Sequence, residues 1–159
     1  MARIDRKYLA HFVNTAAADA PAAYERLGKD LEEFKAELSA KVERKTNILG
    51  RQSVIISGYE KTGAVDTYYA EPGSALFSRL QAIIDGDLVL DDLKTDVVEV
   101  KLWDTAADGS YPAIREVCYI EVTGYGGDST GYQIPFTLHY TGEKTHGMFH
   151  PVDKTFMPN

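Results

Sequence analysis

A chain of 159 residues has the usual size of one domain, and 44% hydrophobic with 26% charged residues excludes a disordered or fibrous chain. The 24 acidic residues outnumber the 17 basic ones and give a formal net charge of -7. The chain therefore lacks the basic surface that a sequence-independent nucleic-acid binder needs. Mild acidity is common in soluble proteins, where net charge keeps the molecules in solution. The alternative interpretation is an acidic surface that lets DNA slide past without binding.

We expect the N-terminal segment, residues 1–23, to be an arm outside the main domain. It ends in the small-residue stretch 15–21, which has neither strand alternation nor an amphipathic stripe. Its first part faintly resembles a signal peptide, but Asp5 lies in the basic region and His11 and Asn14 interrupt the apolar stretch. No apolar run reaches the roughly 20 residues that span a bilayer. We expect a soluble protein made and kept in the cytoplasm.

The next segment, residues 24–48, fits two patterns. Its apolar residues fall at helical spacing at Leu27, Leu31, Phe34 and Leu38. Phe34, Ala36 and Leu38 also alternate with charged residues as a strand would. The periodicity leaves both structures open, and the Glu, Lys, Ala and Leu content favours a helix.

Two strands and a helix are predicted after Gly50. The β-branched run 53–57 predicts a buried strand that ends at Gly58 and pairs with 64–69 through a turn at 59–63. Ser74 is placed to cap a helix that stops at Gly86. Its apolar stripe consists of Leu76, Phe77, Leu80, Ile83 and Ile84. A helix this short is marginal alone in water, so we expect it to lie on a sheet.

From Asp96 onward the chain alternates apolar and polar residues in strand runs separated by turns. The runs 98–103, 114–123 and 134–140 predict a meander of at least three antiparallel strands, with turns at 107–110 and 124–131. Pro135 indicates an edge or a bulge. A last hairpin pairs 145–149 with 154–157.

No motif carries a recognisable reaction. The glycine cluster 124–131 lacks the Lys-Ser/Thr pair of a phosphate loop and is better interpreted as a hairpin turn. His146 and His150 are separated by Gly147, which does not suit the helix of a zinc protease. The acidic residues of 85–92 lack the spacing of a calcium loop and fit a solvated helix exit.

Nucleophile chemistry is equally unsupported. Cys118 is alone, so it forms no internal disulfide, and it alternates onto the presumed core face as an inert thiol. No Gly-x-Ser-x-Gly motif is present, and nothing marks a pair among Glu99, Glu116 and Glu121 as a catalytic acid and base. We therefore expect that the protein is not an enzyme and that it has no cofactor and no metal site.

An ordered set of segments nevertheless resembles one family. The segments cover most of the chain from about residue 24 onward, and they are 26–31, 42–50, 58–60, 66–69, 73–85, 97–100, 120–122, 125–136, 139–142 and 154–156. Together they resemble the major tail tube proteins of long-tailed, siphophage-type bacteriophages and related prophages. Residues before Tyr24 match the family least. The resemblance places a tail tube β domain at 24–159.

The resemblance implies a mainly β (α+β) fold, an antiparallel sandwich or barrel-like core with one flanking amphipathic helix, and strands within 34–48. It also implies a virion structural protein whose hexameric rings stack into a tail tube for DNA ejection. The implied partners are other copies of the chain, the tape-measure protein, and the tail terminator and distal tail proteins. DNA would pass through the tube without specific binding, and no membrane is involved.

Two sets of residues are candidates for roles in such a tube. Acidic residues that would line the lumen and repel phosphates are Glu60, Asp66, Glu99 and Glu121. Aromatic residues for subunit contacts are Trp103, Tyr119, Tyr125 and Tyr132, unless several of them belong to the core.

Two alternatives remain at this point. One is the tube subunit of a phage-derived bacteriocin or contractile particle. The other is a small β-barrel ligand-binding module, although the bulky alternating faces predict a filled interior.

Overall fold

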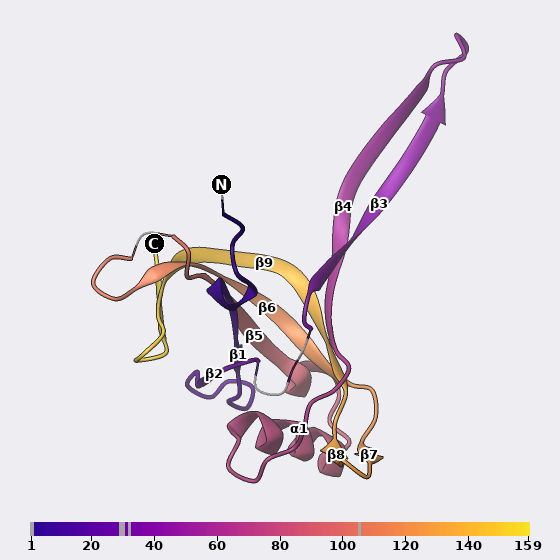
Figure 1. Cartoon of the computed structure of the whole chain (residues 1–159). Helices are drawn as coiled ribbons and strands as arrows, with labels where there is room; N and C mark the ends of the chain where they lie inside the picture. The colour runs from indigo at the N-terminus through magenta and orange to yellow at the C-terminus, as the bar shows by residue number, and fades with distance from the viewer. Residues whose placement is uncertain (1, 29–30, 32, 105) are drawn as a thin grey trace.

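The computed structural model describes residues 2–28, 31, 33–104 and 106–159. The described strands are β1 (Leu9–Asn14), β2 (Tyr24–Arg26), β3 (Ala36–Thr46), β4 (Gln52–Val65), β5 (Lys94–Lys101), β6 (Tyr111–Val122), β7 (Gly126–Asp128), β8 (Gly131–Gln133), β9 (Phe136–His150) and β10 (Thr155–Pro158). The described helices are α1 (Ala75–Gly86) and the short 3-10 turns η1 (Arg6–Tyr8) and η2 (Leu90–Leu93). Figure 1 shows a body built on a curved sheet, from which the β3–β4 hairpin projects.

Antiparallel pairing organises the described strands. The main sheet has the order β2-β1-β5-β6-β9-β4-β3, with β10 paired to β9, and β7 and β8 form a separate hairpin. The meander expected in the second half of the chain is confirmed, since β5 pairs with β6 and β6 with β9. The expected terminal hairpin is confirmed as well, by β9 and β10. The fold is mainly β, with 53% strand and 12% helix, as expected.

Helix α1 begins where its cap was predicted. The Ser74 hydroxyl accepts a hydrogen bond from the backbone N–H of Phe77, which satisfies one of the free donors of the first turn. The helix includes Gly86, where the stop was predicted, and the left-handed residue that ends it is Asp87. Because the aliphatic stripe falls on one face, the helix lies along the sheet (Figure 1).

Two hydrophobic clusters fill the two faces of the sheet. In the first, Leu76 and Leu80 of α1 pack with Val97, Ile120 and Leu138 of the sheet. The second consists of buried residues around β1, β5 and the end of β9, namely Ala10, Phe12, Tyr24, Val98, Val100, Ala113 and Phe149. The interior is filled by side chains, as the bulky alternating faces predicted.

The interpretation of residues 1–23 as an arm is wrong for Leu9–Asn14. This segment is β1, which lies between β2 and β5 with four of its six residues buried. Phe12 packs on one face of the sheet and Val13 on the other. A strand covered on both faces shows a short continuous apolar run in place of alternation, so the periodicity gave no signal. The body therefore begins well before residue 24.

The hairpin β3–β4 differs from the residue-based expectation in three ways. Ala36–Thr46 is a strand, as the family resemblance implied, and the composition pointed wrongly to a helix. The run 53–57 is an exposed part of β4, and 59–63 is strand where a turn was expected. The turn lies at 47–50 instead, and of the ambiguous segment, residues 29, 30 and 32 lie outside the described residues.

The remaining differences are local. Pro135 precedes β9, and its carbonyl accepts hydrogen bonds from the backbone and hydroxyl of Thr123. The glycine cluster 124–131 contributes to the small β7–β8 hairpin, as a turn-rich segment should. Within the described part of the chain, no helix has the length and hydropathy of a membrane span.

Candidate functional site

The most unusual feature of the molecule is the projecting part of the β3–β4 hairpin, which we call the arm and define as residues 37–60. It protrudes from the body beyond the last strand that supports it (Figure 1). Only residues 62–65 of β4 pair with β9. Along the rest of the hairpin, β3 and β4 pair only with each other. About eleven residues of β3 at roughly 3.3 Å each give a length of about 35 Å.

The arm has one apolar and one polar face. Residues that pair directly across an antiparallel ladder lie on the same face, and Val42 pairs with Ile56. The apolar face carries Leu38, Val42, Val54, Ile56 and Tyr59, which are between 50% and 61% exposed, and Arg44 lies on this face beside Val54. The opposite face carries the charged side chains of Glu37, Lys41, Glu43, Lys45 and Glu60, together with the exposed Ile55. A free monomer thus exposes a continuous apolar stripe that its own body does not cover.

A bulge keeps the two faces in phase. The register shifts between Lys41 and Val42, so that Ser57 on β4 has no direct partner. In β4 the apolar residues Ile56 and Tyr59 are three apart, and without the extra residue they would point to opposite faces. The bulge therefore keeps Tyr59 on the same face as Val42 and Ile56.

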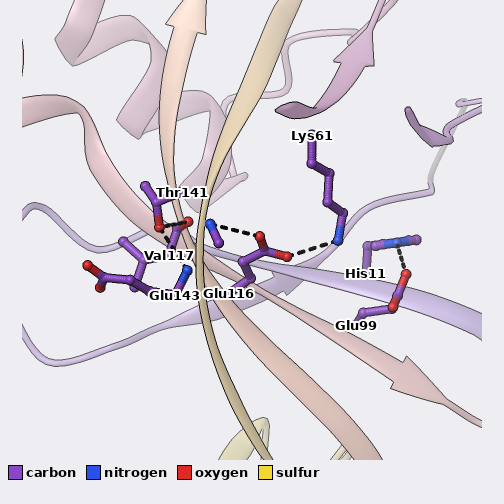
Figure 2. A network of polar contacts seen from close by, with 8 residues as sticks. His11, Lys61, Glu99, Glu116, Val117, Thr141 and Glu143 are labelled. Carbon is purple, nitrogen blue, oxygen red and sulfur yellow. Dashed lines mark hydrogen bonds and ion pairs between the residues drawn. The ribbon is translucent and has the colours of Figure 1, made fainter. Parts of the chain in front are cut away.

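The base of the arm is fixed to the body by a buried ion pair. Lys61 Nζ lies 2.9 Å from Glu116 Oε1, and the backbone N–H of Gly142 donates to the other oxygen of Glu116. The side chains of Lys61 and Glu116 are 19% and 5% exposed, so water screens the pair little. Figure 2 shows Lys61 of β4 reaching Glu116, with the His11–Glu99 pair beside them. The Lys61 ammonium also lies 4.5 Å from the ring centre of Tyr140.

An aromatic contact on the same face also fixes the base. Phe34 is buried and packs so closely on Gly63 that a Cβ there would lie 2.8 Å from the Phe34 ring. The Phe34 ring also contacts His11 edge to face, with 4.8 Å between ring centres. The guanidinium of Arg6 donates to the carbonyl of Phe34 at 2.9 Å. These contacts join the start of the arm to β1.

The second pair at this base is His11 with Glu99. His11 Nε2 lies 3.2 Å from Glu99 Oε1, on the face of the sheet that also carries Glu116. The hydrogen bond with His11 lowers the pKa of Glu99, although partial burial of the carboxylate acts in the opposite direction. Glu99 therefore stays ionised at neutral pH and holds the imidazole in place.

A different buried carboxylate, Asp96, lies on the other face of the sheet. It accepts hydrogen bonds from the hydroxyl of Tyr24 at 2.5 Å, from Arg115 Nε at 3.0 Å and from Asn14 Nδ2 at 2.9 Å. Burial, and then the hydrogen bond and charge of Asp96, raise the pKa of Tyr24. Every oxygen of this carboxylate has a partner, which is the arrangement of a structural group joining β1, β2, β5 and β6.

The four acidic residues predicted for a lumen do not form one surface. Glu60 lies on the polar face of the arm, 3.9 Å from Lys41, and Asp66 is exposed just after β4. Glu121 shares its sheet face with Glu60 and lies 2.6 Å from His139. Glu99 lies on the opposite face. The structure thus brings Glu60 and Glu121 onto a common face and separates Glu99 from them.

The four aromatic candidates also divide. Trp103 and Tyr125 are exposed, in the turn after β5 and before β7. Tyr132 packs edge to face on Phe77 of α1 and donates to Gln81. Tyr119 is half-buried, and its hydroxyl lies 3.4 Å from a carboxylate oxygen of Asp91.

The apolar arm face was missed from the sequence, because its residues were assigned to a helix or to a buried strand. The bulge breaks the period of two in β4, and a projecting strand pair has the same composition as a core strand. Gly58 was interpreted as the end of a strand, but it lies within β4 next to the bulge, where a glycine inside a strand pattern can mark a bulge.

One groove lies next to the arm base. It has a volume of about 570 Å³, and the residues that line it include Arg6, Leu9, His11, Leu27 and Phe34.

Among the described residues, no group of three or more His, Cys, Asp or Glu side chains is arranged to hold a metal ion. Cys118 is buried, as expected, and burial raises the pKa of its thiol. No protein-family model matches the chain, and no significantly similar curated protein was found.

Proposed function

We propose that the protein is a structural subunit that self-associates, and that it forms the tail tube of a long-tailed phage. The observation that carries the proposal is the arm, whose apolar face is exposed in the isolated chain. The ordered resemblance to major tail tube proteins supports the same assignment. Copies arranged around an axis would cover the arm of each subunit and enclose a channel.

The energetics favour a multi-contact assembly over a simple dimer. Five apolar side chains that are about half exposed contribute about 4–8 kcal/mol when a partner covers them, from roughly 1.5–3 kcal/mol for a complete burial. Association costs about 4–15 kcal/mol in lost freedom of motion. One arm contact barely offsets this cost. A closed ring in which every subunit makes several contacts overcomes it, as in the hexameric rings that the resemblance implies.

The polar features of the arm restrict non-specific association. β3 is the terminal strand of the sheet order among the described residues, so its outer backbone edge is open. Lys41, Glu43 and Lys45 occupy this edge strand, and charged side chains on an edge discourage unselected pairing. Association is thereby directed to a matched surface on an identical copy.

The acidic balance of the chain fits a channel for DNA. Glu60 and Glu121 lie on a common exposed face, and with a net charge of -7 such a face would repel phosphates. In this proposal DNA moves along the lumen after the tape-measure protein leaves it, and the terminator and distal tail proteins close the tube ends in the virion.

The test is the assembly state of the purified protein across concentration, by sedimentation velocity and electron microscopy. We expect rings or tubes at high concentration. A variant in which Asn-Gly replaces residues 41–58, joining the paired residues Ala40 and Tyr59, should fold and remain monomeric. Monomers of the full chain under all salt and pH conditions, or equal assembly of the shortened variant, would contradict the proposal.

Two alternatives have distinct tests. A tube from a contractile particle or bacteriocin would bind a sheath protein along its outer surface, which a pull-down on assembled tubes detects. A ligand-binding module is favoured by the groove near the arm base, whose volume of about 570 Å³ is that of a small-molecule site. A saturable rise in melting temperature with a small molecule, abolished by Leu27→Trp, would support it.

A further inference from the structure

The tip of the arm is an ordered structure that presents two large aliphatic side chains to solvent. The carboxamide oxygen of Asn47 accepts hydrogen bonds from the backbone N–H groups of Leu49 and Arg51, and Gly50 takes a left-handed conformation. Ile48 and Leu49 are 102% and 74% exposed on this turn. The turn is therefore preorganised, and its apolar tip has no contact within its own chain to cover it.

The outer part of the arm is basic in an acidic protein. Residues 41–57 contain four basic residues, Lys41, Arg44, Lys45 and Arg51, against the single acidic residue Glu43. All of these side chains are exposed. A partner for the tip needs an acidic surface that also offers apolar contact.

The segment from the end of α1 into η2, which we call the loop, has the complementary chemistry. Residues 85–92 contain four acidic residues, Asp85, Asp87, Asp91 and Asp92, and no basic residue. Each of the four is exposed, and no ion pair joins any of them to a cation in the described part of the chain. Between them, Val89 and Leu90 are 62% and 80% exposed. The loop therefore matches the tip in both respects, with two exposed aliphatic residues inside a charge cluster of opposite sign.

The tip and the loop of one chain cannot meet. The arm extends about 35 Å from the body, and α1 lies on the side of the body away from the tip (Figure 1). We propose that the arm tip, residues 45–51, docks on the loop at residues 85–92 of a second copy. This inference rests on the proposed self-assembly and names the surface that receives the arm.

The contact would be heterologous, because the two matching surfaces differ and lie far apart on each subunit. Repeated from copy to copy, such a contact generates a ring or a stack, whereas two copies that exchange tips would close a symmetric dimer, which sedimentation velocity distinguishes. Each copy then has one tip and one loop occupied, except at the ends of the stack.

Charge reversal tests the contact. We compare an arm variant, Lys45→Glu with Arg51→Glu, with a loop variant, Asp85→Lys with Asp91→Lys. Asp87 is kept because its left-handed backbone favours Asp. Each variant alone should need at least about a tenfold higher concentration than the wild type to assemble. An equimolar mixture should recover assembly, since the acidic arm of one variant meets the basic loop of the other.

The control carries the same change in charge elsewhere. Arg3→Glu with Lys35→Glu alters two exposed basic residues outside the arm and should assemble like the wild type. Melting temperatures establish that every variant folds. If the wild type assembles and either variant assembles equally well, or the mixture fails to recover, the contact is wrong and self-assembly stands. If the wild type never assembles, both proposals fail.

Cross-linking provides a second, geometric test. Leu49→Cys and Leu90→Cys are placed in separate chains and mixed under mild oxidation; the native Cys118 is buried and does not interfere. A disulfide-linked pair of the two different chains is expected in assembled material. Its absence there, with both thiols reactive, would overturn the contact.

Discussion

Replacement of Lys61 by Met isolates the contribution of the buried ion pair at the arm base. The side chain keeps most of its length, but Glu116, whose side chain is only 5% exposed, loses its cation. One hydrogen bond to the carboxylate remains, from the backbone N–H of Gly142. In the variant the buried carboxylate keeps only the Gly142 N–H as a donor, whereas in the wild type the Lys61 ammonium also binds it.

The expected loss follows from these contacts. Removal of one partner from a buried ion pair typically costs about 3–5 kcal/mol. Because Lys61 is partly open to water and Gly142 still donates, we expect a loss of about 2–3 kcal/mol in the free energy of unfolding. A second change, Glu116→Gln, removes the buried charge and retains an acceptor for Gly142. The double variant should therefore be more stable than the sum of the two single losses predicts, by at least about 1 kcal/mol.

The assay is urea denaturation at neutral pH, at a concentration where the protein is monomeric. The matched control is Lys41→Met, because Lys41 pairs with Glu60 on the same hairpin at 3.9 Å with both side chains exposed. We expect the control to lose less than about 1 kcal/mol. Equal losses for Lys61→Met and Lys41→Met, or strict additivity in the double variant, would refute the reasoning.

Three further outcomes are expected. The hydrogen bond with His11 lowers the pKa of Glu99, so the ionised carboxylate stabilises the folded protein above its ordinary pKa near 4.5, and this stability is lost as the pH falls. The unfolding free energies of the wild type and Glu99→Gln should therefore converge in acid. A constant difference between them from pH 7 to 3 would count against this. The Cys118 thiol should react with a thiol reagent only in denaturant, since it is buried and its pKa is raised; rapid labelling of the folded protein would contradict its placement. Gly147→Ala would press a methyl group against the carbonyl oxygen of Met157 and should lower the unfolding free energy by about 1–3 kcal/mol, whereas an unchanged urea midpoint would show that β10 is loosely held.

The elements of the body were predictable where a helical or strand periodicity of apolar residues holds over many residues. The stripe from Leu76 to Ile84 and the cap at Ser74 gave α1, and the alternation after Asp96 gave β5, β6 and β9. β1 was hidden because both of its faces are covered, which removes the alternation that identifies a half-buried strand.

The arm was hidden for a different reason. A period-two pattern indicates that one face differs from the other, but it does not say whether the apolar face meets the body or a separate chain. For Val54 and Ile56 the natural interpretation was burial within the chain, and both are about half exposed. The grouping of the acidic candidates could not be predicted because sheet faces depend on register, and the pairing of Glu99 with Ile114 places Glu99 on the sheet face opposite to that of Glu121.

The geometry of the arm makes its anchor more important for assembly than for folding. A rotation of about 10° at the base displaces a tip about 35 Å away by about 6 Å, which exceeds the reach of a single side-chain contact. Lys61, Phe34 and Gly63 are the groups that fix this direction. A change at Lys61 that leaves the body folded at low temperature should therefore still raise the concentration needed for assembly. Lys35→Met, which alters an exposed lysine outside the arm and leaves the anchor intact, should not have that effect, so the comparison separates the direction of the arm from its presence.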